Sequence, residues 1–346
     1  MNSTKCDFRI VALAVIFAFL FATAVMAQQE PDTTTIEING RIHSPSELLR
    51  LIERSNLVYE LGEDTTLTMQ HPEREVFRTP YYIDSSHGEW ELRNYNMSDS
   101  GSQLLTIADG AFEARDFAAA LELYKEVYDL DPSVSHILTL IGNCYFMLGD
   151  YRSAVSCFEM SIDSNYYDCW AHWFLADAAW IRGDSARAVE EITIAHLLNR
   201  NHEQLLENLV HYRQATGAGW EDWTFEPVYA INQDTSDAHR IEVRCNGDWC
   251  FYAVVKALWK YEPNYAETML ANIESPYDEL MLQEREATIC QLVATKGEDY
   301  TLELLDSNLL DYFIIYEITS RDNPDLLYRS TPETLKTFAK YLDTYH

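Results

Sequence analysis

A pattern typical of a helical hairpin occurs three times along this chain, and successive copies are equally spaced. In each copy a small residue is followed four positions later by a larger apolar one: Ala120 and Tyr124, Ala154 and Phe158, Ala188 and Ile192. This spacing places both side chains on one face of a helix. One hairpin cannot bury its apolar face alone, so a regular period of this length predicts an array of stacked hairpins.

The helix before each of these pairs shows matching positions. Apolar residues recur there at Leu104, Ile107, Leu138, Ile141 and Leu175, and small residues that allow close helix approach stand at Ala108, Gly142 and Ala176. The clearest copy, in which Gly149-Asp150-Tyr151 precedes Ala154 and Phe158, resembles a tetratricopeptide repeat. The resemblance covers about residues 101–201, and 203–217 resembles the first helix of an incomplete fourth unit. It implies an α-α superhelical solenoid, whereas accidental spacing in an ordinary helical bundle would rarely give three units in phase.

The flanking regions show weaker patterns, and we expect a mainly α protein. Residues 28–100 predict a small α+β region or an irregular cap, with alternation at 36–40 and a capping box that starts at Ser44. The repeat array follows at 101–217. Residues 218–346 predict a mainly helical C-terminal domain, with a possible short hairpin near 240–250 where Arg240–Cys245 alternates.

The segment 1–27 has the features of an export signal. Lys5 and Arg9 precede an apolar run from Ile10 to Ala27, and small residues stand at the expected cleavage position. We expect cleavage after Ala27 and a secreted or periplasmic protein without stable membrane insertion. A retained membrane anchor is the alternative, because an apolar run of this length could nearly span a bilayer.

Charge and cysteine content limit the kinds of ligand. The formal net charge of −31 repels nucleic acid phosphates, so nucleic-acid binding is not expected. Because disulfides persist outside the cytosol, Cys245 and Cys250, which flank an Asn-Gly turn, are expected to form one. The chain has no second cysteine pair with the spacing of zinc ligands, so no metal or other cofactor is expected.

Two rows of residues recur in register on the first helices, which line the concave face of such an array. One row, called the acidic row, consists of Asp109, Asn143 and Asp177. The other, called the aromatic row, consists of Phe112, Phe146 and Trp180, with Trp173 nearby. These side chains, called the predicted groove set below, suit an extended peptide with apolar anchors and a basic residue. Some tetratricopeptide proteins hold a terminal carboxylate with Lys, Arg and Asn here. At the corresponding positions this chain has only Asn143 from that set, and the other polar residues are acids. The face therefore favours a positively charged ligand over a carboxylate.

These observations leave three hypotheses. The chain contains no phosphate-binding glycine loop, no Gly-x-Ser-x-Gly motif and no His-Glu-x-x-His motif, so no catalytic residue is assigned. The leading hypothesis is an exported, non-catalytic scaffold that binds a protein or peptide on the concave face. The alternative is an exported enzyme with its site in the C-terminal domain and the repeats presenting its substrate. A third is a structural array whose aromatic residues pack against the chain's own ends.

Overall fold

The computed structural model describes residues 43–69, 81–84, 91–220, 225–271 and 276–346. Two compact units contain these residues: one is formed by the chain up to residue 69 with 226–314, and the other by 70–225 with 315–346. This division differs from the expected order of consecutive domains. Residues 43–69 share a unit with 226–314, and residues 315–346 share the other unit with the repeats. The expected signal peptide and the strand at 36–40 lie outside the described residues. Within them, no helix is both long and apolar enough to cross a membrane.

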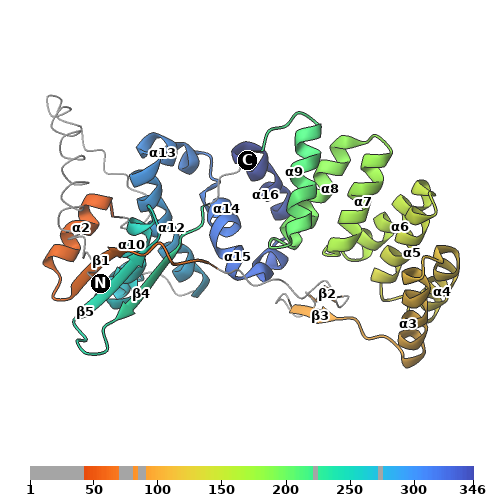
Figure 1. Ribbon diagram of the computed structural model, residues 1–346, viewed down its shortest axis with the longest axis horizontal. Helices are drawn as coiled ribbons and strands as arrows, with labels where there is room; N and C mark the ends of the chain where they lie inside the picture. Colours follow the sequence, from red (N-terminus) through yellow and green to blue (C-terminus); the bar gives the residue numbers. More distant parts are fainter. Residues whose placement is uncertain (1–42, 70–80, 85–90, 221–224, 272–275) are drawn as a thin grey trace, which may run out of the picture. The chain divides into compact units, whose positions relative to one another are not determined.

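The second unit is built on antiparallel helical hairpins, which Figure 1 shows as successive helices in a row. The first helices are α3 (Asp99–Glu113), α5 (His136–Met147), α7 (Cys169–Ile181) and α9 (Glu203–Ala215). The second helices are α4 (Phe117–Leu130), α6 (Tyr151–Ser164) and α8 (Ser185–Leu198). The prediction of a mainly α fold with repeated hairpins is therefore confirmed.

Each turn within a hairpin has the same local chemistry. An aspartate caps the second helix by accepting a backbone N–H three residues later, at Asp116, Asp150 and Asp184. The residue before the aspartate has a positive φ, of 83° at Gly149 and 82° at Gly183, where glycine is favoured. Arg115 adopts a φ of 61° at the equivalent position of the first hairpin.

The repeat pattern in the sequence corresponds to the core of the array. Ala120, Ala154 and Ala188 are fully buried. At Gly142 the two helices of a hairpin approach so closely that an added Cβ would lie 2.5 Å from Cε1 of Phe158. The small and large positions read from the sequence thus form a close contact in this hairpin, whereas Ile107 of the first hairpin is 60% exposed.

The end of the chain returns to the repeats. A π-helical turn, η2 (Ile315–Thr319), leads through α15 (Ser320–Asp322) and the 3-10 segment η3 (Pro324–Arg329) to α16 (Pro332–Tyr345). Helix α16 packs on α8, and Arg213 of α9 forms an ion pair with Asp343. The expected C-terminal domain is thus divided, because its final segment, Ile315–His346, buries its apolar side chains with the repeats.

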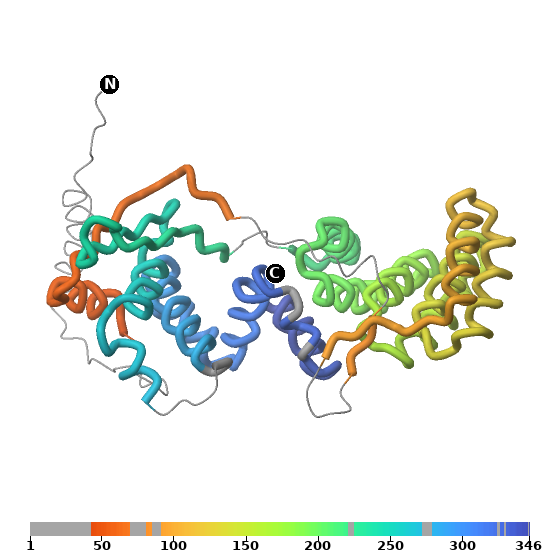
Figure 2. Tube along the Cα trace, turned by 90° about the horizontal axis from the view of Figure 1, so that it is seen from below, coloured from red at the N-terminus to blue at the C-terminus, as the bar shows by residue number. Residues whose placement is uncertain are grey.

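A short antiparallel pair of strands, β2 (Tyr81–Asp84) and β3 (Glu91–Asn94), also belongs to this unit. The backbone carbonyl of Tyr81 accepts a hydrogen bond from Asn165 at 2.8 Å. The extended segment after β3 runs along one side of the repeat helices (Figure 2), where Tyr95 bonds to Ser135. These contacts fix the segment to the loops between successive hairpins.

The first unit combines a three-stranded sheet with helices. Its sheet has the order β1-β5-β4, in which β1 (Val58–Glu63) runs parallel to β5 (Arg240–Cys245) and β4 (Tyr229–Gln233) runs antiparallel. The hairpin β4–β5 therefore begins earlier than the expected range near 240–250. Helix α10 packs on β5. The helices are α2 (Pro45–Arg54), whose Ser44 capping box is confirmed, α10 (Cys250–Tyr261), α11 (Tyr265–Met269), α12 (Pro276–Thr295), α13 (Glu298–Asp306) and α14 (Leu310–Ile314).

Candidate peptide-binding face

The predicted groove set lies on three first helices of the array. Asp109 and Phe112 belong to α3, Asn143 and Phe146 to α5, and Trp173, Asp177 and Trp180 to α7. Helices α5 and α7 contact each other, so their rows are adjacent. Phe112, Phe146 and Trp180 are all partly buried, so neither full exposure nor full burial describes the aromatic row.

The two phenylalanines are held in place at the turn of their own hairpins. Phe112 meets Phe117 edge to face with ring centroids 5.2 Å apart, and Phe146 meets Tyr151 in the same way at 5.3 Å. In both cases the partner is the first residue of the following helix. The geometry is the favourable one for two aromatic rings, and it leaves part of each phenylalanine accessible.

The carboxylates of the acidic row are engaged within the molecule. Tyr124 donates a hydrogen bond to Asp109 at 2.8 Å, and Tyr212 donates one to Asp177 at 2.6 Å. Burial raises the pKa of Asp177, although the bond from Tyr212 opposes this shift. These aspartates therefore join neighbouring helices as well as facing the predicted groove, a role the sequence reading did not foresee. Each retains lone pairs for a further donor.

The tryptophans of α7 form the contact with α9. Trp180 stacks on Tyr212 with a centroid distance of 4.5 Å and an interplanar angle of 9°. Trp173 stacks on Trp170 at 5.6 Å and meets His202 edge to face at 5.5 Å. This part of the predicted groove set is thus partly occupied by the fourth first helix. Accessible apolar side chains stand at the ends of α5 and α7, where Met147 is 48% exposed beside Phe146 and Ile181 is 51% exposed.

A polar cluster lies at the start of α5 and was not assigned from the sequence. His136 Nδ1 lies 2.9 Å from Asp168 Oδ2, and Thr139 donates to the same oxygen at 2.8 Å. Burial alone would raise the pKa of Asp168, but His136 and the hydrogen bonds of Thr139 and of the backbone at Ala171 lower it. Conversely, burial opposes the charge of His136, whereas Asp168 raises its pKa. The only sequence signal was that Asp168 precedes α7 as a capping residue.

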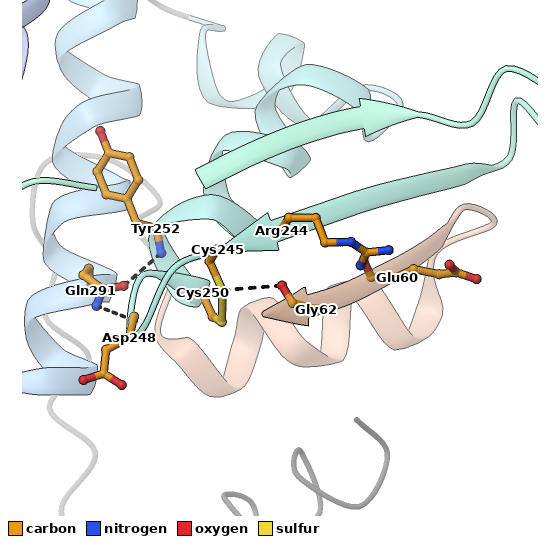
Figure 3. Close-up of a disulfide and its surroundings, with 8 residues drawn as sticks. All are labelled: Glu60, Gly62, Arg244, Cys245, Asp248, Cys250, Tyr252 and Gln291. Atoms are coloured by element: carbon orange, nitrogen blue, oxygen red, sulfur yellow. Dashed lines mark hydrogen bonds between the residues drawn. A yellow bond between two sulfur atoms is a disulfide. The ribbon is translucent and has the colours of Figure 1, made fainter. Parts of the chain in front are cut away.

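The disulfide lies in the first unit, whereas the predicted groove set belongs to the second. Cys245 at the end of β5 is joined to Cys250 at the start of α10 (Figure 3). Gln291 of α12 donates to the carbonyl of Asp248 at 2.7 Å and accepts from the backbone of Tyr252 at 3.1 Å. The loop between the two cysteines is therefore fixed both covalently and by α12. Cys144, Cys169 and Cys290 are buried and not disulfide-bonded, and burial raises the pKa of Cys144 to about 12.

Buried carboxylates of the first unit are saturated by internal partners. Glu286 is fully buried and accepts from Trp259 at 2.7 Å and from Tyr265 at 2.8 Å, with His43 Nδ1 at 2.7 Å. Lys256 pairs with Glu284. Such bonds account for the burial of these acids without assigning them to catalysis. In the ranges that the structure describes, no group of three or more His, Cys, Asp or Glu side chains could hold a metal ion.

Comparisons with known proteins agree with the repeat architecture. Residues 111–165 match the sequence model of the tetratricopeptide repeat family. A probable UDP-N-acetylglucosamine–peptide N-acetylglucosaminyltransferase, SEC, of Arabidopsis thaliana is 28% identical over 117 residues, which are 33% of this chain and 12% of that protein. This chain therefore spans only a small part of that relative. The chain carries tetratricopeptide repeats, and their prediction from the sequence is confirmed.

Two solved structures illustrate the similarity. The first tetratricopeptide domain of human RPAP3 is 19% identical, with 34% of this chain and 92% of that chain covered and a TM-score of 0.33. The Yersinia enterocolitica secretion chaperone SycD, in complex with a peptide of the translocator YopD, is 17% identical, with 34% and 96% covered and a TM-score of 0.32.

Proposed function

We propose that this protein is an exported, non-catalytic scaffold that binds a protein or peptide partner on the concave face of its tetratricopeptide repeats. The observation that carries the proposal is the accessible apolar surface on first helices, where Phe112 and Phe146 occupy the same repeat position and Met147 lies next to Phe146. Apolar side chains that stay accessible together, next to polar ones, are typical of interaction sites. The basic and apolar character of the segment 1–27 supports export.

The chemistry of the face suggests what kind of segment it would take. Asp109 and Glu113 are exposed on α3, and α5 carries no Lys, Arg, Asp or Glu. An extended segment could place apolar side chains against the phenylalanine rings and a basic residue near these two acids. Because Tyr212 of α9 already engages Asp177 and Trp180, and His202 before α9 contacts Trp173, the proposed contact is centred on α3 and α5.

Affinity capture from envelope and secretion extracts, followed by mass spectrometry, tests this proposal. The Phe146→Ala and Met147→Glu variants should each weaken capture of the specific partner roughly tenfold or more, because removing an apolar anchor from an interface centre has effects of this size. The circular dichroism spectrum should not change, because both side chains are partly or largely exposed.

Met160→Glu is the matched control. Met160 is also 48% exposed, but it belongs to the second helix α6 and not to the predicted groove. Capture should survive in this variant. If Met147→Glu and Met160→Glu weaken capture equally, or if neither does, the first-helix face is not the binding site.

A further inference from the structure

The first helix of the array exposes a position that every later repeat buries. Ile107 of α3 is 60% exposed, whereas its equivalents in the three later repeats, Ile141, Leu175 and Leu209, are 5%, 1% and 0% exposed. The same holds one turn to either side. Gln103 and Gly110 are exposed, but their equivalents in α5, α7 and α9 are all buried: Ile137, Ala171 and Leu205 for the first, and Cys144, Ala178 and Tyr212 for the second.

The difference has a plain cause in the array. Helices α5, α7 and α9 contact α4, α6 and α8 of the preceding hairpins. Among the described residues no second helix precedes α3 in the array, so this face of α3 has no such cover. At the opposite end of the array the chain supplies its own cover, because α16 packs on α8 and His346 stacks on Trp220 at 4.8 Å.

Gly110 gives a second indication that another helix approaches here. A glycine inside a helix costs about 1 kcal/mol relative to alanine. At Gly142 the fold explains the glycine, because Phe158 fills the space of a side chain. At Gly110 an added Cβ would meet no described atom within 4 Å, so packing among the described residues gives no reason for the glycine.

We propose that this face of α3 is a dimer interface that binds α3 of a second copy of the chain. Ile107 projects on the same face as Gly110 and Ala111, three and four residues later. In two antiparallel copies related by a twofold axis, each isoleucine fits the gap beside the other copy's glycine, which makes the surface self-complementary. The inference does not depend on the proposed peptide binding.

The charge distribution supports a second copy of the chain as the partner of this face of α3. The centre of this face, formed by Gln103, Ile107, Gly110, Ala111 and Ala114, carries no charged residue, whereas Asp99 lies one turn before Gln103 at its end and the chain has a net charge of −31. Two copies can meet here without opposing carboxylates, and at physiological salt their distant charges are largely screened. Two helices of 15 residues are only about 22 Å long, so the interface is at the small end of specific interfaces and the dimer should be weak.

Sedimentation analysis of the purified mature chain over roughly three decades of concentration tests the proposal. The wild-type chain should show a reversible monomer–dimer equilibrium. Gly110→Leu and Ile107→Glu should each raise the dimer dissociation constant about tenfold or more. Gly110→Leu should not lower the melting temperature of the monomer, because leucine favours the helix and the site is open.

Ile181→Glu serves as the matched control, because Ile181 is 51% exposed on α7 and lies outside this face. It should leave the dissociation constant unchanged. A wild-type chain that stays monomeric at every concentration would overturn the proposal. So would a dimer that is insensitive to both α3 variants, since its interface would then lie elsewhere.

Discussion

At the scale of single residues, two glycines of the first helices experience opposite surroundings. Gly142 faces the ring of Phe158 across a closely packed hairpin, whereas Gly110 faces open space. The sequence identifies the role of Gly142, because it stands where the repeat requires a small residue. Gly110 lies at a position of the period where later repeats carry Cys144, Ala178 and Tyr212, so the period alone does not explain it.

Alanine at each glycine should therefore shift stability in opposite directions. Gly142→Ala should lower the free energy of unfolding by about 1–3 kcal/mol, because the new methyl group overlaps Phe158. Gly110→Ala should raise it by up to about 1 kcal/mol through helix propensity. Urea denaturation followed by circular dichroism measures both effects, at a concentration low enough to keep the chain monomeric. If both substitutions changed the free energy of unfolding by the same amount and in the same direction, the close approach at Gly142 would be absent in solution.

At the scale of elements, the hairpins were predictable and the links between them were not. Helix caps such as Asp150 and small residues such as Ala154 act on near neighbours in the chain, so the sequence displays them directly. The bond from Tyr212 to Asp177 spans 35 residues and joins α9 to α7. Neither residue type signals such a contact. The acidic row was therefore located correctly on the first helices, but its internal hydrogen bonds became apparent only in the structure.

The contact of His136 on α5 with Asp168 at the start of α7 should make stability depend on pH. The pKa of His136 is raised above its usual 6.5, so its contribution is complete below pH 6.5 and is lost as pH rises through the raised value. The pKa of Asp168 is lowered below 3.8, so its contribution is present above pH 3.8 and is lost on further acidification. The pair thus stabilises most between these two values.

His136→Gln should therefore destabilise the repeats by about 1.5–3 kcal/mol between pH 4 and 6.5, the range for a hydrogen bond to a charged group. The difference from wild type should shrink as pH rises above 6.5. Denaturation of both proteins over a series of pH values measures it. In an Asp168→Asn background the pH dependence of the difference should disappear, and its persistence there would assign the effect to another partner.

At the scale of the whole molecule, each compact unit contains segments that are far apart in the chain. Strand β1 pairs with β5, so that Tyr59 lies beside Ile241, and the C-terminal helix α16 packs on α8. Hydrophobic periodicity predicts a helix or strand but not its distant partner. The elements of the flanks could thus be anticipated in part, whereas their distribution between two units could not.

This arrangement predicts that a change in the last helix affects the repeats and not the adjoining C-terminal sequence. Leu335 of α16 is fully buried, so Leu335→Ala should cost about 2–5 kcal/mol in the unit that contains the repeats. Hydrogen exchange should then accelerate in α8 and α9, while α10 and α12 keep their protection, because they belong to the other unit. Lys336→Ala is the control, since Lys336 is exposed on the same helix and its loss should leave both units unchanged. Faster exchange confined to α10 and α12 after Leu335→Ala would mean that α16 packs with those helices and that the division at residue 315 is incorrect.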